Sequence, residues 1–501
     1  MPLLGIDVGT GGSRAVLVAA DGAVLAAATS DHAPFTSPRT GWAEQDPADW
    51  WRASAAAIRS VCAAGGGAGV EAVGLSGQMH GAVVLDRQDR VVRPAILWCD
   101  QRTGDECREI TERVGAARLI ELTSNPAITG FTLPKLLWLR RHEPDAWARI
   151  RTVLLPKDYV RLRLTGERAT DVADASGTLL FDVARRRWSD MMLEATGIDP
   201  SWMARAFEGP EVTGVVSPEA AGETGLRAGT PVVAGGGDQA AGAVGMGAVR
   251  AGVVSVTLGT SGVVFATTDE PVRDAGGRVH TFCHAVPGRW HVMGVTQAAG
   301  LSLRWFRDTF TVRGGRTVPY DALTAEAGTI APGSDGVLWA PYLMGERTPH
   351  LDPDARAALV GLSGSHTRGH VVRAILEGVA FSLRDSLETL RSMGVPVTRV
   401  RAGGGGARSP LWRQILADAF EVPIGTLVAE EGAAFGAALL AGVGVGAWPS
   451  VEAACDRVVR VAGDVAPNPA AVDAMARAYE RYRTLYSALR PTSAGATGGT
   501  R

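Results

Sequence analysis

Hydrophobic and polar residues follow two periods along the chain, one typical of β-strands and one typical of α-helices. An apolar run at 3–8 reaches a glycine-rich turn and continues as a second β-branched run. Residues 253–271 repeat this pattern about 250 residues later, which is half of the chain. Both stretches predict β-hairpins whose turns expose backbone N–H groups. The repeat predicts an ancient duplication and two comparable domains, at 1–247 and 248–490.

Strand-like and helix-like segments alternate between and after these hairpins. The expected strands are 70–77 and 336–343, the expected helices are 132–142, 150–165 and 370–394, and 397–420 should form a strand, a glycine turn and a helix. Such alternation predicts an α/β fold in which mixed sheets are flanked by helices. The small polar residues of 491–501 predict a disordered tail.

Composition narrows the class of protein. The 501 residues carry a formal charge of −2 and 46% of them are hydrophobic, so we expect a globular chain without a nucleic-acid footprint. The apolar stretch 433–448 is shorter than the roughly 20 residues of a membrane span, and a buried helix is expected there. The N-terminal residues lack the pattern of a cleavable signal, and five scattered cysteines without a CxxC pair indicate thiols. We therefore expect a cytoplasmic protein with no nucleic-acid and no membrane partner.

Glycine turns offer backbone donors for phosphate oxygens. The turn GTGGSR at 9–14 leads into a strand and not a helix, so it matches neither the Rossmann fingerprint nor the P-loop. Its N–H groups, with the hydroxyls of Thr10 and Ser13, could wrap a phosphate. GTSG at 259–262 repeats this chemistry in the second half of the chain. Four glycines within 401–409 would let a flat base or ribose approach the backbone closely.

Two aspartates, Asp7 and Asp238, could each have either a structural role or a role in ligand binding or catalysis. Asp7 lies inside an apolar strand just before the first turn, where either backbone donors or Mg²⁺ bound to phosphate could stabilise it. Asp238 lies between three glycines, 235–237, and a helix-forming stretch. It could cap that helix, or it could stand at a strand end where the glycines clear space for a substrate.

Histidines mark a third region. GQMHG at 77–81 ends a strand, and Met79 and His80 should project at the edge where α/β proteins place ligand groups, although a lone histidine is more often structural. The segment 280–291 holds three histidines and one cysteine. Alternate residues of a strand point to opposite faces and no zinc-type spacing is present, so zinc is not expected there.

These motifs resemble the FGGY carbohydrate kinases of the actin-like ATPase superfamily over nearly the whole chain, from residue 5 to residue 485. Residues 130–142 and 358–378 are similar to the two family signatures. Further motifs are most similar to those of members that phosphorylate D-xylulose: GWAEQDPADWW (41–51), SGQMHG (76–81), PAILWCDQR (94–102), LLPKDYVRLRLTG (154–166), GGGDQAAGAVG (235–245), YLMGERTPH (342–350) and GGGARSPLWRQILAD (404–418).

The resemblance implies a fold and a reaction. The fold would be two actin-like (ribonuclease H-like) domains with mixed sheets, and a cleft for ATP and sugar between them. The reaction would be ATP-dependent phosphorylation of a sugar with Mg²⁺. Asp238 would take the proton of the sugar's 5-hydroxyl, and Asp7 would lie near Mg²⁺ and the transferred phosphate.

The other site residues follow from the same resemblance. The sugar-binding residues would be Gln78, Met79, His80 and Gln239, together with Asp238. The ATP-binding residues would be Thr10, Gly11, Ser13, Thr260, Gly404, Gly405 and Ser409. Gln239 stands where many members that act on D-xylulose have asparagine, which weakens the assignment of the sugar but not of the reaction.

Two alternatives stay open from the sequence. One is a kinase for another ketose or polyol, such as D-ribulose, L-xylulose, arabinitol or 1-deoxy-D-xylulose. The more distant one is an actin-like nucleotide switch without a small substrate, which leaves the SGQMHG strand without a role. The resemblance also suggests a homodimer.

Overall fold

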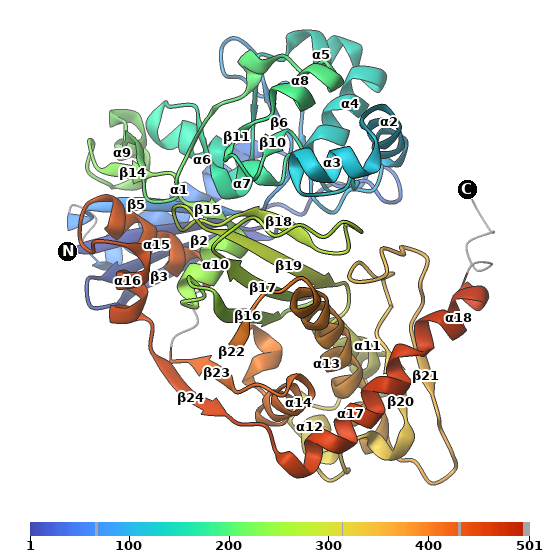
Figure 1. Ribbon diagram of the computed structural model, residues 1–501. Helices are drawn as coiled ribbons and strands as arrows, with labels where there is room; N and C mark the ends of the chain where they lie inside the picture. The colour runs from blue at the N-terminus through green and yellow to red at the C-terminus, as the bar shows by residue number, and fades with distance from the viewer. Residues whose placement is uncertain (66–68, 313, 429–431, 494–501) are drawn as a thin grey trace.

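Two mixed sheets of matching strand order form the centre of the molecule (Figure 1). The structure is a computed structural model that describes residues 1–65, 69–312, 314–428 and 432–493. The first sheet has the order β13 (Val212–Val215), β14 (Pro231–Val233), β5 (Ala72–Gly77), β1 (Pro2–Val8), β2 (Gly12–Ala19) and β3 (Val24–Asp31), with β15 (Gly236–Gly237) beside β5. The second has the order β18 (His280–Cys283), β19 (Trp290–Thr296), β17 (Gly262–Thr268), β16 (Gly252–Leu258), β22 (Val397–Gly403), β23 (Ile424–Leu427) and β24 (Val461–Val465).

The two sheets are built in the same way. In each, an antiparallel hairpin, β1–β2 or β16–β17, stands at the centre. The first strand of the hairpin pairs on its other side with a parallel strand, β5 or β22. The order agrees with the duplication predicted from the two glycine hairpins.

Helices surround both sheets, and five short strand pairs form small sheets of their own among the described residues. The helices before residue 248 are α1 (Pro47–Gly65), α2 (Gly104–Val114), α3 (Ala116–Thr123), α4 (Thr132–His142), α5 (Pro144–Arg149), α6 (Pro156–Thr165), α7 (Val172–Ser176), α8 (Asp190–Thr196), α9 (Pro218–Thr224) and α10 (Asp238–Gly245). Those after it are α11 (Gly300–Phe310), α12 (Tyr320–Gly328), α13 (Arg368–Ser392), α14 (Pro410–Phe420), α15 (Gly432–Gly444), α16 (Val451–Val458), α17 (Pro469–Arg483) and α18 (Leu485–Ser493). The short pairs are β4 (Glu44–Gln45) with β7 (Ala95–Ile96), β6 (Val83–Leu85) with β8 (Thr152–Leu154), β9 (Ala169–Asp171) with β12 (Arg205–Phe207), β10 (Phe181–Asp182) with β11 (Arg187–Trp188), and β20 (Leu338–Ala340) with β21 (Ala358–Val360).

Most predicted elements form where the sequence places them, with two differences. The helix predicted at 150–165 is wrong at its start, because β8 occupies the first residues and α6 begins only at Pro156. Proline is favoured in the first turn of a helix, where a backbone N–H has no helical partner. At the other end of the chain, α18 reaches Ser493, inside the predicted tail 491–501, and residues 494–501 lie outside the described residues.

Helices α10 and α15 connect the two halves of the chain. α15 comes from the second half, yet it packs on β1 and β5 of the first sheet and against α10 (Figure 1). α10 follows the first sheet and places Ala243 in one core cluster with Phe265 and Met293 of the second sheet. The division predicted at residue 247 therefore separates the two sheets along the chain, but α15 crosses it in space.

Glycines allow α15 to lie directly on the strands. A Cβ atom on Gly74 of β5 would lie 1.9 Å from the carbonyl oxygen of Ala437 in α15. A Cβ atom on Gly436 of α15 would lie 1.8 Å from the carbonyl oxygen of Ala241 in α10. The apolar stretch 433–448 thus supplies a buried helix, as predicted, and no helix of the described residues is long and apolar enough to cross a membrane.

Gly74→Ala should lower the free energy of unfolding by about 1–3 kcal/mol, the usual cost of overpacking a core. The added methyl group must push β5 away from α15, because backbone atoms occupy its place. Denaturant unfolding followed by circular dichroism measures the change. Gly222→Ala in α9 is the matched control, since its Cβ would meet nothing within 4 Å and alanine favours a helix. Equal stability of Gly74→Ala and the wild type would contradict the packing described here.

Candidate active site

Three strands of the first sheet end at one edge, and the two candidate carboxylates stand there. The register pairs Asp7 of β1 with Ser76 of β5, and Ser76 with Gly236 of β15. Asp238 follows β15 directly as the first residue of α10. Because these strands are parallel, their carboxyl ends meet at the same edge, where α/β proteins bind ligands.

The glycines before Asp238 are required by close contacts. Gly235 has a φ of +74°, and a Cβ atom there would lie 1.8 Å from the carbonyl oxygen of Leu75. Gly237 is the N-cap of α10, which has no side-chain cap, and Oδ1 of Asp238 accepts a hydrogen bond from the N–H of Gln239 at 2.8 Å. The interpretation of Asp238 as the helix cap is therefore wrong.

Asp7 and Asp238 repel each other in a partly buried setting. Burial and the negative charge of Asp7 raise the pKa of Asp238 to about 7. Burial also raises the pKa of Asp7, against a hydrogen bond at 3.1 Å from the Ser76 hydroxyl and the positive charge of Arg14. Two adjacent carboxylates whose charged forms are disfavoured suit Mg²⁺, which prefers carboxylate, water and phosphate oxygens.

The turn between β1 and β2 directs its carbonyl groups into the protein. Three consecutive carbonyls each accept a hydrogen bond from a donor behind the turn. These are Gly9 from Nε2 of Gln78 at 3.2 Å, Thr10 from Nε2 of Gln45 at 3.0 Å, and Gly11 from the N–H of His32 at 2.9 Å. Among the residues that the structure describes, the N–H groups of Thr10 and Gly11 have no hydrogen-bond partner. The turn therefore presents free donors on its outer side, which is what a phosphate requires.

Two residues predicted to contact a ligand use their side chains inside the protein. The buried hydroxyl of Ser13 lies 2.9 Å from Nε2 of His32 and accepts a hydrogen bond at 2.9 Å from Ser54. The side-chain amide of Gln78 accepts a hydrogen bond at 3.1 Å from the Thr10 hydroxyl. Both side chains thus help to hold the turn, and the roles of Ser13 in ATP binding and of Gln78 in sugar binding stay predictions.

Met79 and His80 lie in the turn that follows β5. His80 has a φ of +69°, and its carbonyl accepts a hydrogen bond at 2.8 Å from Nζ of the buried Lys135. Its Nδ1 lies 2.9 Å from the carbonyl oxygen of Gly177, so Nδ1 carries the proton. Burial and the charge of Lys135 lower the pKa of His80 to about 3, which leaves Nε2 of a neutral ring as an acceptor. The Met79 side chain lies against Gly237, directly before Asp238.

A pocket of about 570 Å³ lies beside the second hairpin. Thr260 of the β16–β17 turn lines it, together with Gly405 and Ser409 of the loop before α14. Gly404 has a φ of +84°, and a Cβ atom there would lie 2.8 Å from the carbonyl oxygen of Leu258. Ser409 also caps α14. Thr260, Gly405 and Ser409, which were predicted to bind the nucleotide, thus share one pocket. The positive φ of Gly404 forms the turn of the loop that carries Gly405.

A buried ion cluster lies behind the strand that leads to Asp238. Nζ of Lys157 is surrounded by three carboxylates: Asp158 at 2.5 Å, Asp171 at 2.5 Å and Asp174 at 3.3 Å. The neighbouring Arg161 donates hydrogen bonds to the carbonyl of Val233 at 2.7 Å and to that of Ala234. The three aspartates lie close enough to hold a metal ion, but the lysine already supplies the positive charge.

Sequence reasoning did not name Gln45, Lys135 or Lys157 as supports of the site. The motifs that carry the family resemblance contain all three. Each contacts a carbonyl or carboxylate of another segment, such as Thr10 for Gln45. The residues around a glutamine or lysine do not indicate a partner so distant in sequence. Only the family motifs that contain these three residues could have pointed to them.

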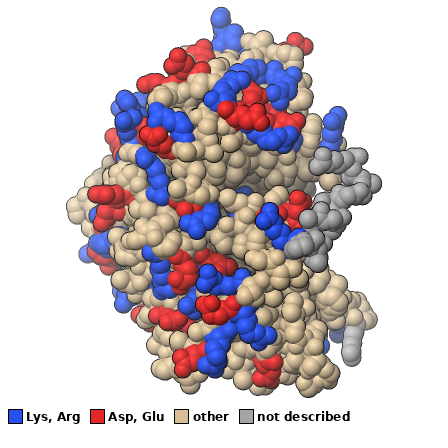
Figure 2. Space-filling model, turned by 45° about the vertical axis from the view of Figure 1, so that its right-hand side comes forward, with Lys and Arg blue, Asp and Glu red and all other residues tan. Residues whose placement is uncertain are grey.

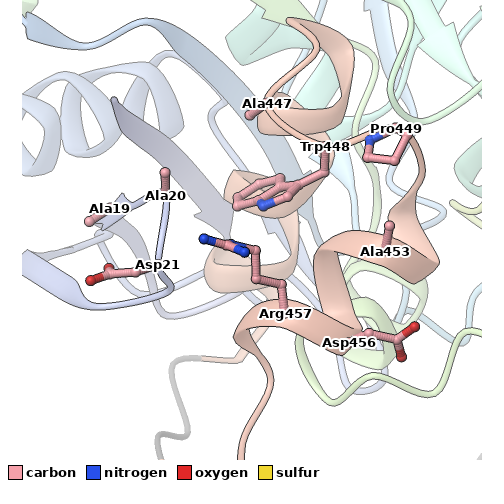
Figure 3. Close-up of a pocket in the computed structure, with 9 residues that line it drawn as sticks. All are labelled: Ala19, Ala20, Asp21, Ala447, Trp448, Pro449, Ala453, Asp456 and Arg457. Atoms are coloured by element: carbon pink, nitrogen blue, oxygen red, sulfur yellow. The ribbon is translucent and has the colours of Figure 1, made fainter.

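The remaining surface is mixed in character. Acidic and basic side chains are interspersed over the face shown in Figure 2. A wide pocket of about 940 Å³ lies between the end of β2 and α16, away from the residues described above (Figure 3). Arg457 points into this pocket near Trp448, whereas Asp456 points outward and forms an ion pair with Arg250. No predicted site residue lines it.

The sequence matches one family over both halves. Residues 2–245 match the N-terminal domain, and residues 254–445 the C-terminal domain, of the FGGY family of carbohydrate kinases. The chain belongs to this family. It is 45% identical over 415 residues to the xylulose kinase of Escherichia coli (strain K12), which covers 83% of this chain and 84% of that protein. It is 32% identical over 464 residues to the gluconokinase of Bacillus subtilis (strain 168), covering 91% and 90%.

Solved structures agree with this membership. The crystal structure described as a xyloylose kinase from Brucella ovis superposes with a TM-score of 0.91 at 40% identity, covering 98% of this chain and all of that one. The FGGY resemblance and the actin-like two-sheet fold predicted from the sequence are therefore confirmed. The protein is a carbohydrate kinase, and kinases of this family use ATP with Mg²⁺.

Gln45→Leu should raise the KM for ATP about tenfold and leave the KM for sugar nearly unchanged. Leucine cannot donate to the Thr10 carbonyl, and losing such a hydrogen bond costs roughly 1–2 kcal/mol. The first turn would then hold its N–H groups less firmly toward the phosphate. Steady-state kinetics with varied ATP measures the effect, and Gln88→Leu on an exposed turn is the control. An equal rise in both KM values would instead indicate a general loss of structure.

Proposed function

We propose that this kinase phosphorylates D-xylulose on its 5-hydroxyl, producing D-xylulose 5-phosphate and ADP. The position of Asp238 carries the proposal, since it stands at the carboxyl edge of the first sheet between Asp7 and the turn of His80. Its pKa of about 7 suits a group that must accept a proton near neutral pH. The similarity to the xylulose kinase of E. coli supports the choice of sugar.

Asp238 is the general base of the proposed reaction. Its carboxylate accepts the proton of the 5-hydroxyl while the hydroxyl oxygen bonds to the γ-phosphorus of ATP. The bond from this phosphorus to the bridging oxygen breaks, and ADP leaves. When bound, Mg²⁺ neutralises the phosphate charge, and Asp7 is the residue that would hold it. The protein otherwise supplies alignment, which phosphoryl transfer requires more than covalent chemistry.

The sugar lies between Asp238 and the turn after β5 in this proposal. Nε2 of His80 accepts a hydrogen bond from a sugar hydroxyl, because Nδ1 already donates to Gly177. Met79 offers an apolar surface to the carbon chain. The Gln239 side chain, next to the base, binds a further hydroxyl.

The nucleotide lies between the two hairpins in this proposal. The free N–H groups of Thr10 and Gly11 hold the transferred phosphate, and Thr260 contacts the phosphates from the second hairpin. Gly405 and Ser409 line the pocket beside Thr260, and Gly404 turns their loop, which supports their predicted role in binding the adenosine. A cytoplasmic location belongs to the proposal and is supported by the five cysteines, all of them free. The homodimer stays a prediction.

Asp238→Asn should lower kcat with D-xylulose by about 10²- to 10⁴-fold, the usual contribution of a positioned base. The amide keeps the shape of the carboxylate but accepts no proton. A coupled ADP-release assay measures the loss, and the thermal midpoint should not fall, because burial disfavours the charge. Asp190→Asn at the exposed first position of α8 is the matched control. A kcat near that of the wild type would remove Asp238 from the role of base.

The kcat/KM for sugar should fall as the pH drops through about 7, the pKa of Asp238. Asp238 accepts a proton only in its charged form, which exists above this pKa and is lost below it. A pH profile at saturating ATP, with the fold monitored by circular dichroism at each pH, tests the expectation. A flat profile through neutrality would contradict a base of this pKa.

A further inference from the structure

Beyond the predicted contacts, a second histidine lies behind the proposed sugar site. The His280 ring of β18 lies 5.5 Å from the ring of Phe131 and 5.8 Å from that of Phe282. The same two phenyl rings lie 4.8 Å and 6.1 Å from the ring of His80. His280 is 2% exposed. The two histidines come from different halves of the chain and face one pair of phenyl rings.

The hydrogen bonds of His280 fix its tautomer. Asn125 donates through Nδ2 to the carbonyls of Thr123 and Thr281, so its Oδ1 is the atom that faces Nδ1 of His280 at 3.2 Å. Nδ1 must therefore carry the proton. Burial keeps the ring neutral by lowering its pKa well below the usual value. Nε2 of His280 is left as a buried acceptor without a partner in the described part of the chain.

Arg347 reaches the same region from the YLMGERTPH segment. Its neighbour Thr348 donates a backbone hydrogen bond to Val295 of β19 at 3.0 Å, and Met293 of β19 pairs with His280. The charge of Arg347 acts on the pKa of both histidines. No hydrogen bond or ion pair of its guanidinium occurs within residues 1–65, 69–312, 314–428 and 432–493.

The adjacent carboxylate does not neutralise this arginine by contact. The buried Glu346 accepts hydrogen bonds from the Thr296 hydroxyl at 2.6 Å and from the N–H of Gln297 at 3.0 Å. Burial raises the pKa of Glu346 to about 7, so its charge is only partly present at neutral pH. A part-buried guanidinium with unused donors thus lies near enough to the two histidines to lower the pKa of each.

These groups are complementary to one end of a ketose. Arg347 can only donate, whereas Nε2 of His80 and Nε2 of His280 can only accept. We propose that Arg347 donates to the C2 ketone oxygen of the sugar, and that the C1 hydroxyl donates to Nε2 of His280. The α-hydroxyketone end of the substrate then lies against the second half of the chain, while His80 accepts from a hydroxyl nearer the base.

The same chemistry selects against an aldonic acid. A carboxylate would satisfy Arg347 but has no proton to donate to the bare nitrogens of His80 and His280. A site whose buried acceptors stay unpaired rejects such a ligand, because each unpaired group carries its desolvation cost. The inference rests on the proposed ketose kinase activity and names the part of the ketose that is recognised.

Arg347→Met tests the first contact. The KM for D-xylulose should rise about 10- to 100-fold, the effect of losing a hydrogen bond to a charged group. The KM for ATP should stay unchanged, whereas a general loss of structure would change it as well. Arg347→Lys should recover part of the affinity, and Arg356→Met, at an exposed position beyond this segment, should behave as the wild type. An unchanged KM for D-xylulose would overturn the role of Arg347.

1-Deoxy-D-xylulose tests the second contact, because it lacks only the C1 hydroxyl. The wild type should show a KM for it about 10- to 100-fold above that for D-xylulose. In His280→Phe, which keeps an aromatic ring among the phenyl rings, the two KM values should become nearly equal. Equal KM values in the wild type, or a ratio unchanged in His280→Phe, would overturn this contact without relying on the stability of the variant.

A parallel assay separates failure of the inference from failure of the proposed function. Wild-type protein that phosphorylates none of the ketoses would overturn the proposed function, and the inference with it. A wild type that phosphorylates D-xylulose, with an unchanged KM in Arg347→Met and an unchanged KM ratio in His280→Phe, would overturn the inference alone. Activity on D-xylulose with the changes described above supports both.

Discussion

The molecule keeps two carboxylates together at the end of one sheet against their mutual repulsion. Strand register does this, since β1, β5 and β15 end at the same level and carry Asp7 and Asp238 with them. Gly235 packs directly against the backbone of Leu75 in β5, which keeps β15 in this register. A side chain on Gly235 would push β15, and Asp238 with it, away from β5. The raised pKa of Asp238 is a direct result of this placement, because burial and the charge of Asp7 cause it. The sheet thus gives Asp238 the raised pKa that the proposed base requires.

The duplicated sheets are joined by an exchange of helices. α15 lies on β1 and β5, and α10 brings the chain from Asp238 to the second sheet. Because glycines place the helix backbone almost on the strands, the edge that holds Asp7 is fixed by a segment of the other half. In the proposed sugar site, Arg347 and His280 come from that same half. A movement between the two sheets would therefore change the site and the packing of α15 together.

Local sequence patterns correctly predicted the helices, hairpins and turns that depend on contacts between residues close in sequence. Both hairpins, α4, α13 and the glycine turn before α14 follow from apolar periods and turn residues, and they form as expected. The candidate residues Asp7, Asp238 and His80 were found because an unusual residue at a strand end is visible in the sequence. The hydrogen bonds of Ser13 to Ser54 and of Gln78 to Thr10 were not predicted, because these partners are distant in sequence. The place of α15 depends on contacts across the whole chain, which no local period contains.

The buried cluster around Lys157 supports the strand before Asp238. Three aspartates surround one lysine, and Arg161 adds a second positive charge, so the group would carry one excess negative charge if every carboxylate were ionised. Burial raises the pKa of Asp174 well above its usual value, and its protonated form brings the group to neutrality. A neutral and tightly paired cluster is far less costly to bury than a charged one. Arg161 can then donate its hydrogen bonds to the carbonyls of Val233 and Ala234. These bonds hold the backbone that leads to Asp238, the proposed base.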